Sequence, residues 1–159
     1  MNGLVFVTLN IPGSNNNLGR TAEMDREHAR RMAANFDWLD EAVAQAEARD
    51  ALGLVIFVQA NPGFDGNPRR RPGAPDGFLE FRKVLAMHAD WLRKPILFVH
   101  GDTHRFRVDQ PLIDPKTGLP FSHFTRLEVD GSPFVNWARV TVDPGSAELF
   151  RIQRGQVPF

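Results

Sequence analysis

The first hundred residues alternate between short apolar runs and longer amphipathic segments. Three runs are apolar at nearly every position and rich in β-branched and aromatic side chains: residues 4–9, 52–58 and 95–99. Because neither face of such a run is polar, the pattern is typical of strands buried on both sides of a parallel sheet.

The two segments between these strands have the spacing of helices. In the first, Met32, Phe36, Leu39 and Val43 recur three or four positions apart, and Thr21 can cap a helix that continues to about residue 50. The second follows Asp76 and carries an apolar stripe: Phe78, Phe81, Leu85, His88 and Leu92. The order of strand, helix, strand, helix, strand predicts an α/β fold with a parallel sheet covered by helices.

The last third of the chain has a different pattern. Residues 125–130, 134–143 and 147–153 resemble strands, and residues 130–133 and 143–146 between them are rich in Asp, Gly, Ser and Pro. These residues are typical of tight turns. We therefore expect an antiparallel meander after the parallel strand–helix repeats, all within one domain covering residues 1–159.

Composition and charge exclude several classes of function. The 19 basic and 19 acidic residues cancel, so the basic excess expected of a protein that binds nucleic acid or an anionic membrane is missing. With no cysteine, the chain has no disulfide, thiolate metal site or cysteine nucleophile. The apolar runs are too short to span a membrane, and the N-terminus lacks the basic residue of a signal peptide. We expect a soluble, cytoplasmic chain.

Polar residues follow each of the three predicted strands. Asn10 and residues 14–17 follow the first strand, Gln59 and Asn61 follow the second, and residues 100–104 follow the third. In open parallel sheets, ligands bind at the carboxyl ends of the strands. The three polar loops together therefore predict a binding site at this edge of the sheet.

The third loop, His100-Gly101-Asp102-Thr103-His104, carries side chains that bind metals. Imidazole and carboxylate groups at this spacing can converge on one divalent ion. The alternative interpretation is a loop in which Asp102 accepts hydrogen bonds from backbone amides while the histidines are solvated.

This loop resembles the end of the metal site in calcineurin-like metallophosphoesterases, which is a Gly-His-x-His loop after an apolar strand. Asp102 stands where that family has its first histidine. Further segments resemble a bacterial branch of the superfamily: residues 7–10, 13–17, 59–62, 100–109, 124–128 and 137–144. The resemblance covers the C-terminal half of the family's αββα sandwich.

The resemblance implies roles for individual residues. His104 and Asp102 would be metal ligands, and Gln59 or Asn61 falls near the family's mid-chain histidine ligand. His100 would act in catalysis by steadying the substrate, and the loop of Asn15, Asn16 and Asn17 would lie near the phosphate. The implied cofactor is a divalent metal (Mn, Fe, Zn or Mg), and the implied substrate is a phosphoester.

The family's earlier ligand motifs, Asp-x-His, Gly-Asp-x-x-Asp and Gly-Asn-His, do not precede this loop. We therefore expect Met1 to align with about the middle of a full-length relative. Two hypotheses follow: a metal-dependent phosphoesterase-like hydrolase or its inactive remnant, and a non-catalytic binding or assembly module. Because half of the sandwich would be missing, a homodimer is expected.

Other polar residues carry less information. His88 lies on the apolar stripe of the second helix, which predicts a core or interface position. We expect His28 to be solvated on a charged helix face. Residues 69–71, three consecutive arginines, predict a solvated loop, with a phosphate contact as the less favoured alternative.

Overall fold

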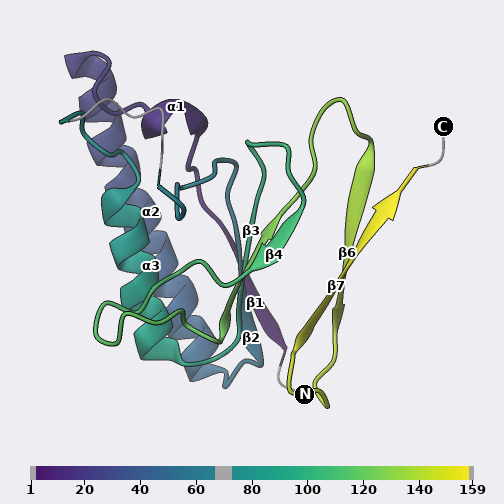
Figure 1. Cartoon of the computed structure of the whole chain (residues 1–159). Coiled ribbons are helices and arrows are strands. Elements are labelled where there is room, and N and C mark those ends of the chain that lie inside the picture. The colour runs from purple at the N-terminus through teal and green to yellow at the C-terminus, as the bar shows by residue number, and fades with distance from the viewer. Residues whose placement is uncertain (1–2, 67–72, 158–159) are drawn as a thin grey trace.

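The computed structural model describes residues 3–66 and 73–157 and is built in three layers (Figure 1). Helices α2 and α3 cover one face of a five-stranded sheet, and a two-stranded hairpin lies against the other face. Within the described residues, no helix is both long and apolar enough to cross a membrane.

The central sheet has the strand order β1-β2-β3-β5-β4. Its strands are β1 (Leu4–Thr8), β2 (Gly53–Phe57), β3 (Ile96–His100), β5 (Phe124–Glu128) and β4 (Arg107–Asp109). Strands β1, β2, β3 and β5 are parallel, and only β4 is antiparallel to its neighbour. The parallel sheet and its three apolar strands are confirmed, each strand to within a residue or two.

Both predicted long helices are present. Helix α2 spans Ala22–Ala48, and the Thr21 hydroxyl accepts a hydrogen bond from the Met24 N–H at 3.2 Å. Helix α3 spans Leu79–Leu92. Phe78, the first residue of the predicted stripe, is the N-cap residue and precedes the helix. Its N–H donates to the Asp76 carboxylate at 3.0 Å. A third element, α1 (Gly13–Asn16), is a short turn in the loop after β1.

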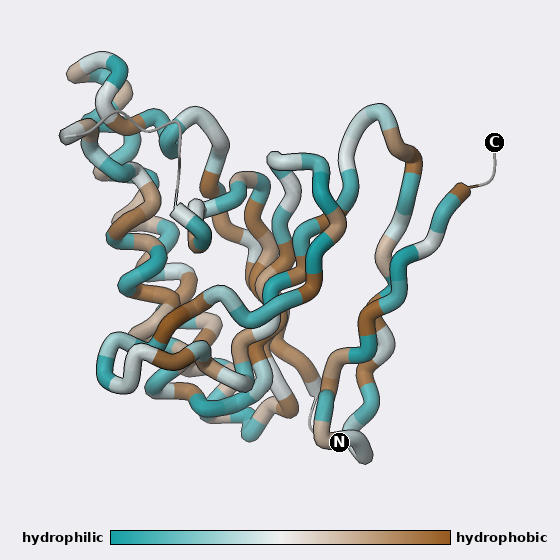
Figure 2. Tube along the Cα trace, viewed as in Figure 1, coloured by the Kyte–Doolittle hydropathy of each residue, from teal (hydrophilic) through white to brown (hydrophobic). Residues whose placement is uncertain are grey.

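The two faces of the sheet are buried to different extents. The helix side holds a large core that includes Leu39, Ile56, Phe81 and Phe98. On the hairpin side only Val55, Leu97 and Leu127 form the fully buried cluster, packed against apolar residues of the hairpin. Figure 2 shows hydrophobic residues concentrated in the strands, between the helices and the hairpin.

The predicted three-strand meander is wrong. Strand β5 belongs to the central sheet, parallel to β3, with Phe124 beside Ile96 and Glu128 beside His100. Only β6 (Asn136–Val142) and β7 (Phe150–Gln156) pair as an antiparallel hairpin. Turn residues predict that a chain reverses, but they do not determine which strand becomes its neighbour. Strand β5 is buried on both faces, which an interior position in the sheet provides.

Candidate functional site

The polar loops predicted from the sequence meet at one edge of the sheet and line a cleft of about 820 Å³. Ser14 and Asn15 come from the loop after β1, Asn61 follows β2, and residues 102–104 follow β3. A second, more apolar cavity of about 480 Å³ lies between α3 and residues 111–116. It contains none of the predicted site residues.

Hydrogen bonds hold the three loops together. The Gln59 side-chain oxygen accepts from the Gly13 N–H at 2.9 Å, which joins the second loop to the first. Asp102 Oδ2 accepts from the Asn61 N–H at 3.2 Å, which joins the third loop to the second. The Asn61 side-chain oxygen accepts from the Gly63 N–H at 2.9 Å. The amide oxygens of Gln59 and Asn61, both predicted metal ligands, are therefore engaged by backbone amides.

Asp102 and His104 are exposed in the cleft, and both have positive φ, +81° and +58°. Non-glycine residues rarely adopt this conformation, and it is more frequent at functional sites. His104 Nδ1 lies 2.8 Å from the Ser132 carbonyl oxygen, so Nδ1 carries the proton and Nε2 is the nitrogen with a lone pair. The ring packs on Gly131, where an added Cβ would lie 2.6 Å from His104 Cδ2.

These side chains do not form the donor set of a two-metal centre. Among residues 3–66 and 73–157, no three His, Asp or Glu side chains are grouped so that they could hold a metal ion. Asp102 and His104 remain the candidate ligands for a single ion. The divalent metal stays a prediction.

His100, the predicted catalytic residue, lies buried behind the cleft at the end of β3. Its Nδ1 donates to the Gly101 carbonyl at 2.9 Å, and its Nε2 has no hydrogen-bond partner in the described part of the chain. Burial lowers the pKa of His100, although the bond to Gly101 and the nearby Glu128 carboxylate oppose that shift. The imidazole is therefore neutral at pH 7, and it does not line the cleft.

A network of buried charges beside His100 was not predicted. Arg126 and Glu128 are fully buried on β5. Arg107 Nη2 lies 2.6 Å from Glu128 Oε2, the Thr103 hydroxyl also donates to Glu128, and Arg126 Nη2 lies 2.5 Å from Asp109 Oδ2. The signal was present in the sequence. Residues 107–109 read Arg-x-Asp and residues 126–128 read Arg-x-Glu, so opposite charges face each other when the two strands pair antiparallel.

Asp65 connects this network to the cleft. Its carboxylate lies 2.7 Å from Arg107 Nη1 and 3.1 Å from Arg126 Nη1. Burial raises the pKa of Asp65, but hydrogen bonds from Arg126 and Arg107 outweigh it and hold that pKa below its usual value. Asp65 is therefore ionised at neutral pH, and it neutralises arginine charge at the cleft wall.

The asparagine loop adopts an unusual backbone. Ser14, Asn15, Asn16 and Asn17 all have φ between 53° and 65°, a left-handed turn that asparagine tolerates better than most residues. The Asn15 side chain accepts from the Gly77 N–H at 3.0 Å and donates to the Leu18 and Pro75 carbonyls. Asn16 is fully buried and donates to the Gly77 carbonyl at 2.8 Å.

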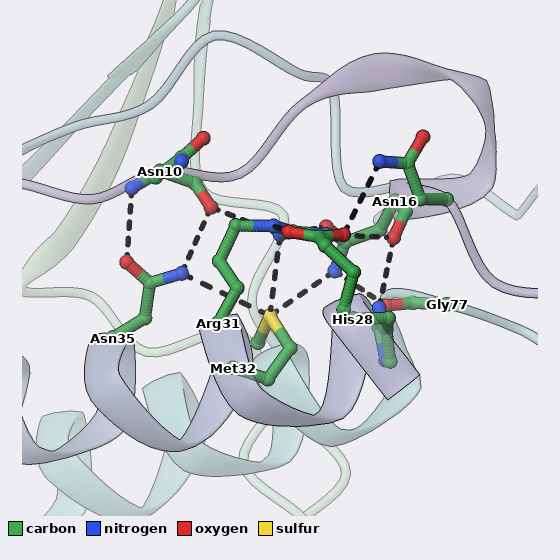
Figure 3. Close-up of polar contacts among 9 residues, drawn as sticks. Asn10, Asn16, His28, Arg31, Met32, Asn35 and Gly77 are labelled. Carbon is green, nitrogen blue, oxygen red and sulfur yellow. Dashed lines mark hydrogen bonds and ion pairs between the residues drawn. The ribbon is translucent and has the colours of Figure 1, made fainter. Parts of the chain in front are cut away.

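Side chains of helix α2 also form hydrogen bonds with the asparagine loop (Figure 3). Arg31 donates to the Asn16 side-chain oxygen at 2.6 Å and to the Asn10 carbonyl at 3.0 Å. His28 Nδ1 donates to the Asn16 carbonyl at 2.8 Å, so the prediction that His28 is solvated is wrong. Asn35 exchanges two hydrogen bonds with the Asn10 backbone.

The three asparagines predicted near a phosphate thus have structural roles. Asn16 is buried, and the Asn17 side chain donates to Glu27 Oε2 at 3.3 Å on α2. Of the three, Asn15 lines the cleft, and its amide group is engaged within the loop. Ser14, which also lines the cleft, brings a hydroxyl group to its surface.

Arg105 is another cleft residue that the sequence did not predict to be part of the site. It follows the His-Gly-Asp-Thr-His loop and is exposed in the cleft. Two other cleft arginines are engaged, Arg82 with Asp76 at 2.9 Å and Arg107 with Glu128 at 2.6 Å. No hydrogen bond or ion pair from the described residues engages the Arg105 guanidinium. Its position directly after the loop was the available signal.

The arginines at 69–71 lie outside the described residues. Comparison with known proteins gives no further guide, since no protein family and no curated protein matches the chain.

Proposed function

We propose that the cleft binds a phosphate ester, and that the chain supplies one part of a phosphoesterase-like site. The observation that carries this proposal is the position of Arg105. Three arginines line the cleft, and Arg105 is the one whose guanidinium contacts no charged or polar group of the described residues. A guanidinium group suits phosphate because it donates paired hydrogen bonds as well as carrying charge.

Once the paired groups are set aside, the described cleft residues offer one cation, Arg105, and one carboxylate, Asp102. Asp65 and Asp76 are both paired with arginines, so they add no net negative charge to the wall. Asp102 is the remaining carboxylate, with one oxygen accepting from the Asn61 N–H. A ligand anion would therefore contact Arg105, and a cation held by Asp102 would offset the repulsion from that carboxylate.

The layers of the fold support a phosphoesterase-like interpretation. In the sandwich that the sequence resembles, two sheets face each other and helices cover their outer faces. Here helices cover one face of the central sheet and a β layer faces the other. A sheet with helices on one face and a β layer on the other is what part of such a sandwich would contain.

Asp102 and His104 are the side chains that would hold a divalent ion in this cleft. When bound, such an ion would neutralise phosphate charge and activate a water molecule. The protein's own contribution is orientation: the Ser132 carbonyl fixes the His104 ring, and the Asn61 N–H fixes Asp102. His100 would stabilise the loop from behind rather than contact the ligand.

The second hypothesis, a non-catalytic binding or assembly module, is favoured by the engaged amide groups. Gln59, Asn61 and Asn15 all use their side-chain oxygens to hold the backbone in place. Such a cleft can bind a ligand without turning it over. A binding module shares the bound anion with the first hypothesis and differs in that no hydrolysis follows, whereas an assembly module needs no anion.

The test is calorimetric titration with inorganic phosphate and with p-nitrophenyl phosphate. We compare the parent with Arg105→Ala and with Arg49→Ala. The second variant makes the same charge change just before β2, at the end of the strands that is far from the cleft. Losing hydrogen bonds to a charged group costs about 1.5–3 kcal/mol, so Arg105→Ala should weaken binding about tenfold to a hundredfold. Arg49→Ala should bind as the parent does. No binding by the parent, or equal binding by all three proteins, would refute the proposal.

A further inference from the structure

Strand β1 forms one edge of the central sheet, and its outer backbone groups are unpaired by any described strand. The Leu9 N–H donates to the Phe57 carbonyl at 2.9 Å, and the Gly3 carbonyl accepts from the Leu52 N–H at 2.8 Å. Odd-numbered residues of this strand therefore direct their backbone groups at β2. By alternation, Leu4, Phe6 and Thr8 direct their N–H and C=O groups away from the sheet.

The two edges of the sheet are protected very differently. The opposite edge, β4, is only three residues long and carries charged Arg107 and Asp109. Short length and charge are the usual devices that prevent another strand from pairing with an edge. Strand β1 reads Leu-Val-Phe-Val-Thr, with no charge, proline or glycine, and its register with β2 is continuous. The β1 edge has none of the protection that β4 has.

The side chain at the middle of β1 adds an apolar contact. Phe6 is 64% exposed on the hairpin side of the sheet, and Phe57 on the adjacent strand is 38% exposed. The register places Phe6 beside Val55 and Phe57 beside Thr8, so the two rings belong to one surface. This surface borders the unpaired edge.

We propose that a second copy of this chain docks on the β1 edge, with the two strands antiparallel about a two-fold axis at Phe6. Phe6 would then face Phe6 of the other copy, and Leu4 would face Thr8. Because these residues direct their backbone groups outward, each of the facing pairs would be a hydrogen-bonded pair. The strand is uncharged, so two copies meet without repulsion between like charges.

The size of this contact sets the expected affinity. A five-residue strand is about 17 Å long, and its pairing buries less than the roughly 1,600 Å² of a standard stable interface. We therefore expect a reversible dimer with a dissociation constant in the micromolar range. Strand pairing supplies the specificity, and burial of the two Phe6 rings adds apolar contact.

The absence of cysteine makes the test direct, since one introduced cysteine is a unique reporter. In an antiparallel hydrogen-bonded pair, facing Cα atoms are about 5.5 Å apart, within reach of a disulfide. Phe6→Cys should therefore form a covalent dimer under mild oxidation. Leu4→Cys alone and Thr8→Cys alone should not, because each lies about 14 Å from its own copy. A mixture of the last two variants should cross-link.

The oligomeric state in solution provides the second measurement. The parent should dimerise with concentration in sedimentation equilibrium, Phe6→Glu should be a monomer, and Trp91→Glu should dimerise as the parent does. Trp91 is 68% exposed on α3, in the layer opposite the hairpin, so it is the matched apolar control. A parent that stays monomeric at 100-micromolar concentration, or equal cross-linking of Leu4→Cys and Phe6→Cys, would refute the proposal.

Discussion

Replacing Gly77 with alanine should destabilise the protein by displacing the asparagine loop. A Cβ atom at this position would lie 2.0 Å from the Asn15 carbonyl oxygen and 2.9 Å from its carbonyl carbon. Both are backbone atoms, so no side-chain rotation relieves the overlap. The Gly77 backbone also accepts from Asn16 at 2.8 Å and donates to Asn15 at 3.0 Å.

The magnitude follows from those two hydrogen bonds. Each contributes about 1 kcal/mol, and a buried group left without a partner costs about 1–3 kcal/mol. Gly77→Ala should therefore lower the free energy of unfolding by about 2–4 kcal/mol, a large part of the roughly 5–15 kcal/mol that stabilises a typical domain. At about 2–4 °C per kcal/mol for this chain length, Tm should fall by roughly 5–15 °C.

Urea unfolding followed by circular dichroism measures this difference, with Gly3→Ala as the control. A Cβ at Gly3 would meet no atom within 4 Å, so this variant should match the parent or be slightly more stable. Ligand binding provides a second measure, because the loop carries Ser14 and Asn15 into the cleft. Equal stability of Gly77→Ala and Gly3→Ala would show that the contact between this loop and Gly77 does not hold the fold together.

Three further predictions follow from the buried groups and the cleft. Burial lowers the pKa of His88, and the Asp40 carboxylate, 2.8 Å from His88 Nε2, opposes that shift without cancelling it. The unfolded chain therefore takes up a proton first, and stability should fall as pH drops below about 6.5, by up to about 1.4 kcal/mol per pH unit. The slope should be smaller in His88→Gln. Arg107→Met leaves the fully buried Glu128 carboxylate without its arginine partner and should cost about 3–5 kcal/mol in urea unfolding, whereas Lys83→Met, at an exposed pair with Glu80, should cost about 1 kcal/mol or less. Calorimetric titration with manganese should show one weak site that His104→Ala removes, and hydrolysis of bis-p-nitrophenyl phosphate by the chain alone should stay at background. Equal metal binding by both proteins, or robust turnover, would contradict this.

The elements of the fold were predictable where the signal is local. The apolar runs at 4–9, 52–58 and 95–99 mark strands by composition, and the capping hydroxyl of Thr21 marks the start of a long helix. Strand pairing is not local, and for this reason the meander prediction failed. Residues 124–128 pair with a strand that lies almost thirty positions earlier, and no turn signal encodes that choice.

The sequence predicted which loops meet at the candidate site, but it did not predict the hydrogen bonds of their side chains. Strand-end geometry correctly brings residues after β1, β2 and β3 to one cleft. The sequence could not show that the amide groups of Gln59 and Asn15 are engaged by the backbone, since those bonds cross 46 and 62 residues. Arg126 was overlooked because a charged residue in an apolar strand is normally expected at the surface, and here Asp109 and Asp65 compensate its burial.

The unequal cover on the two faces of the sheet gives the molecule two levels of cooperativity. Strands β6 and β7 pair with each other and with no strand of the central sheet, and a small apolar cluster holds them there. Local opening free energies fall with the amount of apolar contact that is broken. The hairpin should therefore detach and return many times for each global unfolding event, and its amide hydrogens should exchange with solvent faster than those of β2 and β3. The helices and the parallel strands form the unit that resists unfolding, and the hairpin is a separable cover on it.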